Sequence, residues 1–320
     1  MSIKNVAVLG SGLIGSSWAT LFAKSGYNVK LYDVSKDVLA GVKTRIAANY
    51  DKFLKADIMT QEEIDAAMAR IYTTASLEEA VSDADFIQEC GPEVLSIKQD
   101  LIAEIDKYNT EAIIGSSSSA LRTTDIQAKS AYPGRVIGAH PFNPPHLMPL
   151  VELITGEKTD KKNIRIAYDF YKTNKKEPIV LNKEVVGFVG NRLQAAYTRE
   201  MIDIVMKGIC SVEDVDKASL YGLGLRYAII GPNLNGDLNG GEGGLRDYYT
   251  KYGPGVFEAS FKDGMGEWHE LPKEFVETVG PEGVRQEKEN RPPELGKTRE
   301  EIIQYRDNFL LALLKLHNKV

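Results

Sequence analysis

Cysteine is scarce in this sequence, with only Cys90 and Cys210 among 320 residues. A disulfide framework is therefore excluded, and a reducing compartment is the simplest environment for the chain. No apolar run approaches the roughly 20 residues that a membrane-spanning helix requires. The N-terminus leads directly into an apolar, strand-like run and shows no signal-peptide pattern. We therefore expect a cytoplasmic protein that has no membrane partner.

A strong excess of one charge is also missing, because the formal net charge is -6 and the pI is near 5.5. Nucleic acid therefore has no broad electrostatic reason to bind, and an anionic substrate would need a local basic pocket. Hydrophobic residues make up 43% of the chain and charged residues 26%, which is typical of a globular protein. Its length suggests about two domains.

A glycine-rich turn lies near the N-terminus, between the apolar run at residues 6–9 and a predicted helix at residues 14–25. Gly10 permits a tight turn, Gly12 lets the backbone approach a pyrophosphate, and Gly15 lets the helix lie close to the sheet. The helix N-terminus offers unpaired N–H groups and a positive dipole end to phosphates. We therefore predict a dinucleotide-binding loop made of Gly10, Gly12, Leu13, Ile14 and Gly15.

The nature of the dinucleotide follows from the end of the next predicted strand, residues 29–32. Asp33 follows this strand and is placed to accept hydrogen bonds from the adenosine ribose hydroxyls. Val34 and Ser35 offer no guanidinium for a 2'-phosphate. NAD is therefore favoured over NADP, while FAD is the competing occupant of the same motif.

The first half of the sequence alternates short β-rich runs with longer helical patterns, as a doubly wound parallel sheet requires. The predicted strands are residues 6–9, 29–32, 71–74, 86–89, 112–116 and 136–139, extended by 150–154 and 178–181 with a change of strand direction allowed. Predicted helices follow at 187–207 and at 212–221, the second opened by a Ser211–Asp214 capping box. We predict an α/β Rossmann-type NAD-binding domain, with a doubly wound and mostly parallel sheet, over residues 1–184. A mostly α-helical second domain follows over residues 185–320.

Two further segments have two interpretations each, and a third has one. Residues 38–54 and 61–69 form either a solvated helical hairpin or a substrate-facing arm that uses Lys52 or Lys55. The glycine-rich segment 231–244 lacks the strand context of a phosphate loop, so we expect turns and helix caps, with a substrate or subunit contact as the alternative. Residues 290–294 are predicted to be a hinge before a last amphipathic helix at 298–316.

Hydride transfer from an alcohol to NAD needs a base that takes the hydroxyl proton. Only four histidines are present: His140, His146, His269 and His317. His140 follows the predicted strand 136–139, at the sheet edge where ligands bind in open α/β folds. Glu152 lies in an apolar run, where a carboxylate is costly unless it is paired. Glu152 is therefore either the charge partner of His140 or an edge-strand residue that faces water.

Other polar residues stand beside the same edge. Ser119 ends a run of four serines after the strand at 112–116, and four hydroxyls there can simply form a turn and a helix cap. Asn143 and Asn191 lie beside a proline-rich segment and a helix start, where a cap or turn role is the simpler interpretation. We predict no metal site.

Taken together, five motifs resemble the L-3-hydroxyacyl-CoA dehydrogenase superfamily. They are Gly10-Ser-Gly-Leu-Ile-Gly15, residues 116–121, His140-Pro-Phe-Asn143-Pro, Leu150-Val-Glu152-Leu, and Gly187-Phe-Val-Gly-Asn191-Arg-Leu. The match is ordered and spans about residues 3–230. Within the superfamily, the His-Pro-x-Asn-Pro-Pro and Pro149-Leu-Val-Glu-Leu motifs look most like the lambda-crystallin branch of L-gulonate 3-dehydrogenases.

The resemblance implies a role for each matching residue. His140 would be the general base and Glu152 its charge partner, while Ser119 and Asn191 would hold the substrate oxygens. Asn143 matches a residue near the nicotinamide, and Glu93 and Lys98 match cofactor-side contacts. Family members pair through the helical domain, so the resemblance also implies a homodimer.

The resemblance leaves the substrate open. The fatty acyl-CoA enzymes carry Gly-Pro-Phe-Glu-Leu-x-Asp where this chain has Gly231-Pro-Asn-Leu-Asn-Gly-Asp237, which disfavours coenzyme A as the handle. We expect oxidation of the 3-hydroxyl of a small polar hydroxy acid resembling L-gulonate, with Arg226 as a candidate for binding its carboxylate or as a structural ion-pair partner. The alternatives are a hydroxyacyl-CoA dehydrogenase, a non-catalytic crystallin-like protein and an L-carnitine dehydrogenase. An L-carnitine dehydrogenase could use an aromatic cage drawn from Tyr227, Tyr248, Tyr249 and Trp268.

Overall fold

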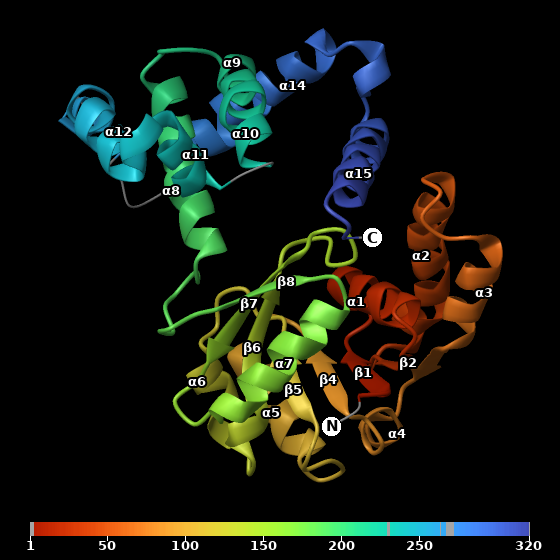
Figure 1. Ribbon diagram of the computed structural model, residues 1–320. Helices are drawn as coiled ribbons and strands as arrows, with labels where there is room; N and C mark the ends of the chain where they lie inside the picture. Colours follow the sequence, from red (N-terminus) through yellow and green to blue (C-terminus); the bar gives the residue numbers. More distant parts are fainter. Residues whose placement is uncertain (1–2, 229–230, 263, 267–271, 320) are drawn as a thin grey trace. The chain divides into compact units, whose positions relative to one another are not determined.

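A computed structural model describes residues 3–228, 231–262, 264–266 and 272–319 of the chain (Figure 1). The chain forms two compact units, one of Met1–Gly190 with Gln304–Val320 and the other of Asn191–Ile303. This division differs from the predicted boundary because the C-terminal segment groups with the first unit. Leu311 and Leu314 are buried in the same hydrophobic cluster as the first strand. Trp268 and His269 lie outside the described residues.

The first unit contains one eight-stranded sheet in the order β3-β2-β1-β4-β5-β6-β7-β8. The strands are β1 (Asn5–Leu9), β2 (Asn28–Tyr32), β3 (Ile71–Thr74), β4 (Phe86–Glu89), β5 (Ile113–Ser116), β6 (Val136–Pro141), β7 (Leu150–Thr155) and β8 (Glu177–Val180). Every neighbouring pair is parallel except β6 and β7, which are antiparallel. The predicted α/β fold, its mostly parallel sheet and the change of strand direction are thus confirmed.

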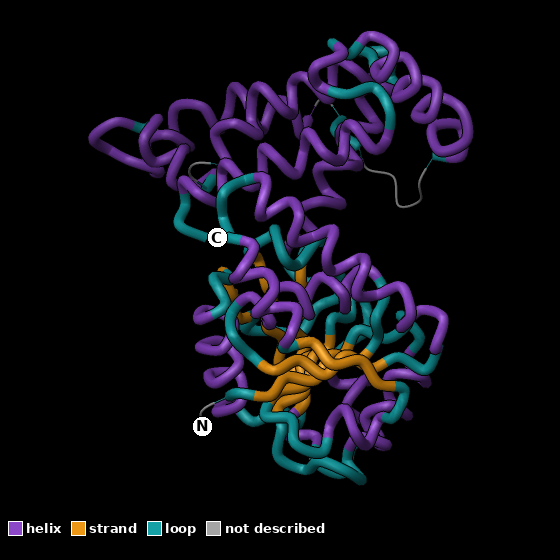
Figure 2. Tube along the Cα trace, turned by 90° about the vertical axis from the view of Figure 1, so that its right-hand side faces the viewer, coloured by secondary structure: helices purple, strands orange, loops and turns teal. Residues whose placement is uncertain are grey.

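Helices cover both faces of this sheet (Figure 2). Alternate residues of β1 join different core clusters, because successive side chains of a strand point to opposite faces. Val6 and Val8 pack in one cluster, while Ala7 and Leu9 pack in the other. One face carries α1 (Leu13–Lys24), α2 (Lys36–Lys55), α3 (Gln61–Ala69), α7 (Lys161–Thr173) and part of α15 (Arg299–Leu316). The other carries α4 (Leu77–Val81), α5 (Leu95–Ile105) and α6 (Thr123–Ile126).

The structure gives no support to a substrate-facing role of Lys52 or Lys55 in α2. Lys52 instead forms an ion pair with the buried carboxylate of Asp307 in α15, and Lys55 pairs with Asp51 within α2. The C-terminal segment is also held by a hydrogen bond from Lys315 to the carbonyl of Ala56. These contacts favour the helical hairpin over the substrate-facing arm.

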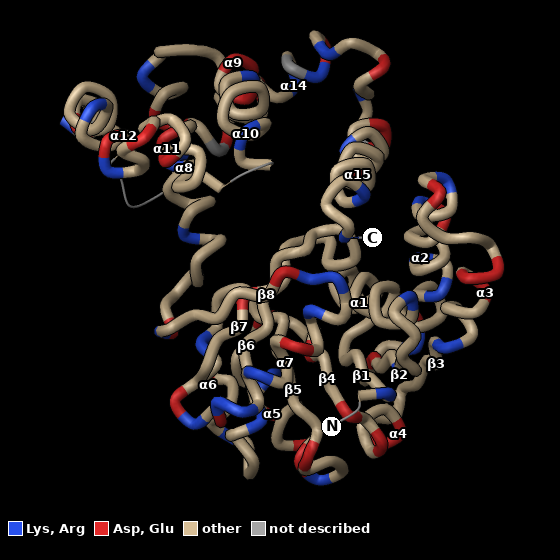
Figure 3. Tube along the Cα trace, in the orientation of Figure 1, with Lys and Arg blue, Asp and Glu red and all other residues tan. Residues whose placement is uncertain are grey.

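The described part of the second unit is helical. It comprises α8 (Gly190–Met206), α9 (Val212–Lys217), α10 (Leu225–Tyr227), α11 (Pro232–Asn239), α12 (Gly244–Tyr252), α13 (Ala259–Lys262) and α14 (Gly280–Asn290), with π-helical turns at Ala218–Gly224, Gly253–Glu258 and Phe275–Val279. The helix predicted at 187–207 begins later, because Gly187 and Phe188 have positive φ angles of 77° and 51°. Acidic and basic residues are interspersed over the elements of both units (Figure 3).

The expectation of turns and caps throughout residues 231–244 is wrong for α11. Pro232 occupies the first turn of this helix, where its missing N–H costs nothing. Gly236 is buried, and a Cβ at this position would lie 2.9 Å from Leu245 of α12. Asp237 also accepts a hydrogen bond from the backbone N–H of Leu245 at 2.9 Å. Close packing against α12 therefore favours a helix despite the poor intrinsic propensity of glycine and asparagine.

None of the helices among the described residues is both long and apolar enough to span a membrane.

Candidate active site

The glycine loop connects β1 to α1 and shows why each glycine is needed. Gly10 has a φ angle of 100°, and a Cβ there would lie 2.6 Å from the carbonyl oxygen of Cys90. A Cβ on Gly15 would lie 1.7 Å from the carbonyl oxygen of Gly10, so only glycine lets α1 approach this turn. By contrast, a Cβ on Gly12 would have no described protein atom within 4 Å. Gly12 therefore borders open space, as close approach of a pyrophosphate requires.

The N-terminus of α1 fits an anionic ligand. Gly12 is its N-cap residue and gives no side-chain cap, and the first turn contains no acidic residue. The first N–H groups of the helix thus form a site at which phosphate oxygens can accept hydrogen bonds. Leu13 is 61% exposed and stands at the start of this turn beside Ile14.

Asp33 is held at the end of β2 next to the same loop. Its Oδ2 accepts hydrogen bonds from the backbone N–H of Ser11 at 2.8 Å and from the Ser11 hydroxyl at 2.9 Å. Its Oδ1 accepts one from the N–H of Ser35 at 3.0 Å. Burial alone would raise the pKa of Asp33, but these hydrogen bonds lower it below its ordinary value. A charged carboxylate therefore stands at the end of β2, beside the glycine loop.

The carboxyl ends of the central strands meet at one edge of the sheet. The register aligns Leu9 with Glu89 and Glu89 with Ser116, while Ser116 lies opposite Gly138, two residues before His140. Because these strands are parallel, the residues that follow them all lie at this edge. The glycine loop, the serine run and His140 are thereby brought to the same side of the first unit.

His140 and Glu152 form a buried pair across the antiparallel strands β6 and β7, where the register places them directly opposite each other. The Nδ1 of His140 lies 2.7 Å from Oε2 of Glu152, and the two residues are only 4% and 0% exposed. The pairing that the sequence spacing left open and the family resemblance implied is therefore present. With Nδ1 engaged by the carboxylate, Nε2 is the nitrogen that remains for proton transfer.

Two backbone N–H groups complete the environment of Glu152. Its Oε1 accepts hydrogen bonds from Val189 at 2.8 Å and from Gly190 at 2.9 Å, both just before the long helix α8. Burial would raise the pKa of Glu152, but the hydrogen bonds from His140, Gly190 and Val189 lower it below its ordinary value. The carboxylate thus stays negative beside the imidazole and can stabilise its protonated form.

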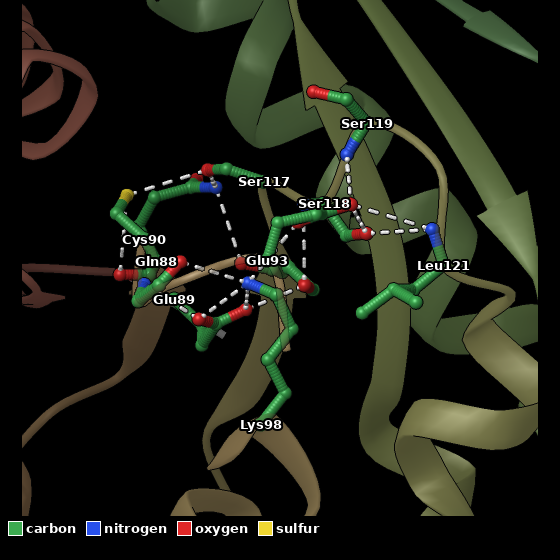
Figure 4. A network of polar contacts seen from close by, with 12 residues as sticks. Gln88, Glu89, Cys90, Glu93, Lys98, Ser117, Ser118, Ser119 and Leu121 are labelled. Carbon is green, nitrogen blue, oxygen red and sulfur yellow. Dashed lines mark hydrogen bonds and ion pairs between the residues drawn. The ribbon is translucent and has the colours of Figure 1, made fainter. Parts of the chain in front are cut away.

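The serine run after β5 wraps around the carboxylate of Glu93 (Figure 4). Oε1 of Glu93 accepts hydrogen bonds from the Ser118 hydroxyl at 2.5 Å and from the backbone N–H of Ser119 at 3.0 Å. Lys98 is 1% exposed, and its Nζ lies 2.9 Å from both carboxylate oxygens of the fully buried Glu89. The structure therefore shows Glu93 and Lys98 bound to groups of the protein itself.

Asn143 lies on the loop at residues 142–149, which follows β6. Side chains of the first unit hold this loop through buried hydrogen bonds. The N–H of His146 donates to the Ser17 hydroxyl at 2.8 Å, and His146 Nδ1 lies 2.7 Å from the same oxygen. Burial lowers the pKa of His146 to about 3 and that of Lys176 to about 7. Nζ of Lys176 donates to the carbonyl oxygens of Pro145 and Met148 and lies 5.1 Å from the Trp18 ring centroid.

The sequence reasoning missed Glu89, Lys176 and the structural role of His146. Glu89 ends the predicted strand at 86–89, and a carboxylate at the end of a buried strand is a signal like the one that pointed to Glu152. Lys176 stands between charged neighbours and looks like an exposed residue in the sequence. Its burial depends on the loop that packs over it, which no local pattern reveals.

The remaining predicted residues belong to the second unit. Asn191 lies in the first turn of α8, and Arg226 is exposed on α10. Among the proposed cage residues, Tyr248 and Tyr249 pack against each other with ring centroids 5.3 Å apart. The predicted substrate contacts of Asn191, Arg226, Tyr227, Tyr248 and Tyr249 stay predictions.

Comparison with known proteins places the chain among dehydrogenases. Residues 5–185 match the NAD-binding domain of 3-hydroxyacyl-CoA dehydrogenase, and residues 187–279 match the C-terminal domain of the same family. The L-carnitine dehydrogenase of Bacillus cereus is 36% identical over 99% of this chain and 94% of its own length. That of Pseudomonas aeruginosa is 35% identical over 98% of this chain and 93% of its length.

Solved structures agree with this assignment. The NAD⁺-dependent 5-formyl-3-hydroxy-2-methylpyridine 4-carboxylic acid 5-dehydrogenase is 27% identical with a TM-score of 0.82, covering 99% of both chains. The (S)-3-hydroxybutyryl-CoA dehydrogenase of Ralstonia eutropha is 27% identical with a TM-score of 0.66, covering 83% of this chain and 98% of its own. The chain therefore belongs to the 3-hydroxyacyl-CoA dehydrogenase family and is an NAD-dependent 3-hydroxy acid dehydrogenase.

Proposed function

We propose that this protein oxidises the 3-hydroxyl group of L-carnitine with NAD. The observation that carries the proposal is the similarity to L-carnitine dehydrogenases along nearly the whole chain, combined with the buried His140–Glu152 pair. L-Gulonate, which the sequence motifs placed first, has no comparable support among these relatives. The segment Gly231–Asp237 differs from the corresponding segment of the fatty acyl-CoA enzymes, which also disfavours a coenzyme A thioester as the substrate.

The proposed reaction uses His140 as the general base. NAD, when bound, would supply the acceptor for the hydride that leaves C3 of the substrate, and the O–H proton would pass to Nε2 of His140. Glu152 stabilises the imidazolium that forms and holds the ring through Nδ1. Ser119 and Asn191 donate hydrogen bonds to the substrate oxygen as it becomes a carbonyl.

The first unit offers the groups needed to hold NAD. The N–H groups at the start of α1 would bind the pyrophosphate next to Gly12, and Asp33 would accept hydrogen bonds from the adenosine ribose. Asn143, on the supported loop after β6, would lie on the nicotinamide side. Ser11 and Ser35 orient the Asp33 carboxylate before the cofactor arrives.

A substrate screen tests the proposal. Purified protein with NAD should form NADH with L-carnitine at a higher kcat/KM than with L-gulonate, 3-hydroxybutyrate or a 3-hydroxyacyl-CoA, as followed by NADH absorbance. D-Carnitine is the matched control, because it presents the same functional groups with the opposite configuration at C3. Turnover of L-gulonate without turnover of L-carnitine would reject the carnitine assignment. Tight NAD binding without turnover of any of these compounds would favour the non-catalytic alternative.

We also propose that the second unit mediates a homodimer. Its described helices expose large apolar side chains, among them Leu193 at 68%, Leu220 at 55% and Tyr221 at 63%. These three residues line a largely apolar hollow of about 890 Å³ within the unit. Exposed apolar patches of this kind mark protein contacts.

The homodimer proposal predicts a molecular mass of twice the 35.4 kDa chain by light scattering after gel filtration. Leu220→Asp should shift the protein to the monomer, because a buried charge opposes association. Val34→Asp, at an 81% exposed position of the first unit, is the control and should leave the mass unchanged. A wild-type protein that elutes as a monomer at micromolar concentration contradicts the proposal.

A further inference from the structure

The carboxylate of Glu93 fills a nest of backbone N–H groups in the loop after β5 (Figure 4). Its Oε1 accepts a hydrogen bond from the hydroxyl of Ser118. The same oxygen also accepts hydrogen bonds from three successive backbone N–H groups: Ser119 at 3.0 Å, Ala120 at 2.9 Å and Leu121 at 3.3 Å. Successive N–H groups that converge in this way form a binding site for an anion. Here the anion is a side chain of the protein itself.

Glu93 is in turn anchored by a buried charge network. Nζ of Lys98 lies 3.7 Å from Oε2 of Glu93, and it also donates to the carbonyl oxygen of Gly91 at 3.1 Å. The same ammonium contacts both oxygens of Glu89, whose Oε2 accepts a hydrogen bond from the Ser116 hydroxyl at 2.5 Å. The network thereby connects the end of β4, the start of α5 and the end of β5.

The ionic state of Glu93 is suited to this role. Burial would raise the pKa of Glu93, but the hydrogen bonds from Ser118, Ala120 and Leu121 and the nearby Lys98 lower it below its ordinary value. The carboxylate is therefore charged at neutral pH, and hydrogen bonds to a charged acceptor are stronger than those between neutral groups.

We propose that Glu93 is a positioning residue for Ser119, and that it acts on catalysis through this loop. The inference rests on the proposed role of Ser119 as a donor to the substrate oxygen. In Figure 4 the N–H of Ser119 faces Glu93, while the Ser119 side chain points away from the carboxylate. Glu93 thus fixes the backbone of Ser119 without engaging the hydroxyl through Oε1.

The substitution Glu93→Gln tests this role with little change of volume. Glutamine keeps one carbonyl oxygen but loses the negative charge, so the three N–H groups lose their charge-assisted acceptor. We expect hydrogen exchange of the amides at residues 119–121, measured by mass spectrometry on a peptide that covers them, to become about tenfold faster. Glu104→Gln is the matched control, because Glu104 lies on α5, the helix that follows Glu93, and contacts Lys107 and Tyr108 at the surface. It should leave this exchange unchanged.

A double-mutant cycle tests the link to catalysis. Glu93→Gln should lower kcat about tenfold in the wild-type background and have almost no further effect in the Ser119→Ala background, because both changes remove the same interaction. The Kd for NAD, measured by fluorescence titration, shows how much of the loss in kcat/KM comes from cofactor binding, and we expect most of the loss to remain at saturating NAD. A weaker NAD affinity that accounts for the whole loss of kcat/KM, or additive effects of the two substitutions, would overturn the inference.

The exchange measurement needs no substrate, so it separates this inference from the carnitine assignment. If L-carnitine is not oxidised, the proposed substrate is wrong, and the cycle is run with the hydroxy acid that the screen identifies. Unchanged amide exchange in the Glu93→Gln variant overturns the positioning role regardless of which substrate is used. Faster exchange together with a non-additive cycle supports it.

Discussion

Replacing His140 with alanine is expected to lower kcat by about 10²–10⁴-fold, the usual contribution of a general base. The imidazole is the group placed to take the hydroxyl proton, and its Nδ1 is already committed to Glu152 at 2.7 Å. The Kd for NAD should stay within about twofold of the wild-type value, because the glycine loop and Asp33 lie on other elements. Steady-state kinetics with L-carnitine and titration with NAD measure the two quantities.

Glu152→Gln is the companion variant, because glutamine preserves the shape of the side chain. Its carbonyl oxygen can still accept the hydrogen bonds of Val189 and Gly190, but it no longer supplies a negative charge to the imidazole. The loss in kcat should therefore be large, while the backbone before α8 stays in place. Near-normal turnover of the His140→Ala variant would contradict the assignment of His140 as the base.

The sheet could be predicted closely from the sequence because its strands are short runs rich in β-branched and aromatic residues, separated by longer helical patterns. β3 and β4 match the predicted residues 71–74 and 86–89, and the other predicted strands differ at their ends by only a few residues. The glycine loop was equally accessible, because Gly10 and Gly15 are each required by a close backbone approach.

The His140–Glu152 pair shows where sequence reasoning stops. A carboxylate in an apolar run indicates that a partner exists, but the run does not say which one. The pairing depends on the antiparallel register of β6 and β7, which places the two residues opposite each other. Only the resemblance to a known family favoured this partner beforehand.

The C-terminal segment illustrates a second limit. The apolar positions of residues 298–316 predict a helix that buries one face, yet they contain no information about what covers it. In the structure Leu311 and Leu314 join the core of the first unit, and Asp307 pairs with Lys52. The Lys52–Asp307 contact joins residues 255 positions apart, at a separation where local patterns carry no signal.

The largest loss of stability is expected from Lys98→Met. Its ammonium is the cation that faces the fully buried carboxylate of Glu89, at 2.9 Å from both oxygens. Removing one partner of a buried ion pair leaves an uncompensated charge in the interior, which costs about 3–5 kcal/mol of the free energy of unfolding. Urea unfolding of the NAD-free protein, followed by the fluorescence of the buried Trp18 in a Trp268→Phe background, measures this loss.

Lys107→Met is the matched control from the same region of the chain. Lys107 pairs with Glu104 at 2.6 Å, but these side chains are 64% and 41% exposed, so the variant should cost at most about 1 kcal/mol. Equal losses in the two variants would contradict the idea that Glu89 depends on Lys98 for compensation. The double substitution Glu89→Leu with Lys98→Met then separates charge from packing. Recovery of most of the lost stability would show that the burial of an unpaired carboxylate, and not the loss of contacts made by the lysine stem, caused the destabilisation.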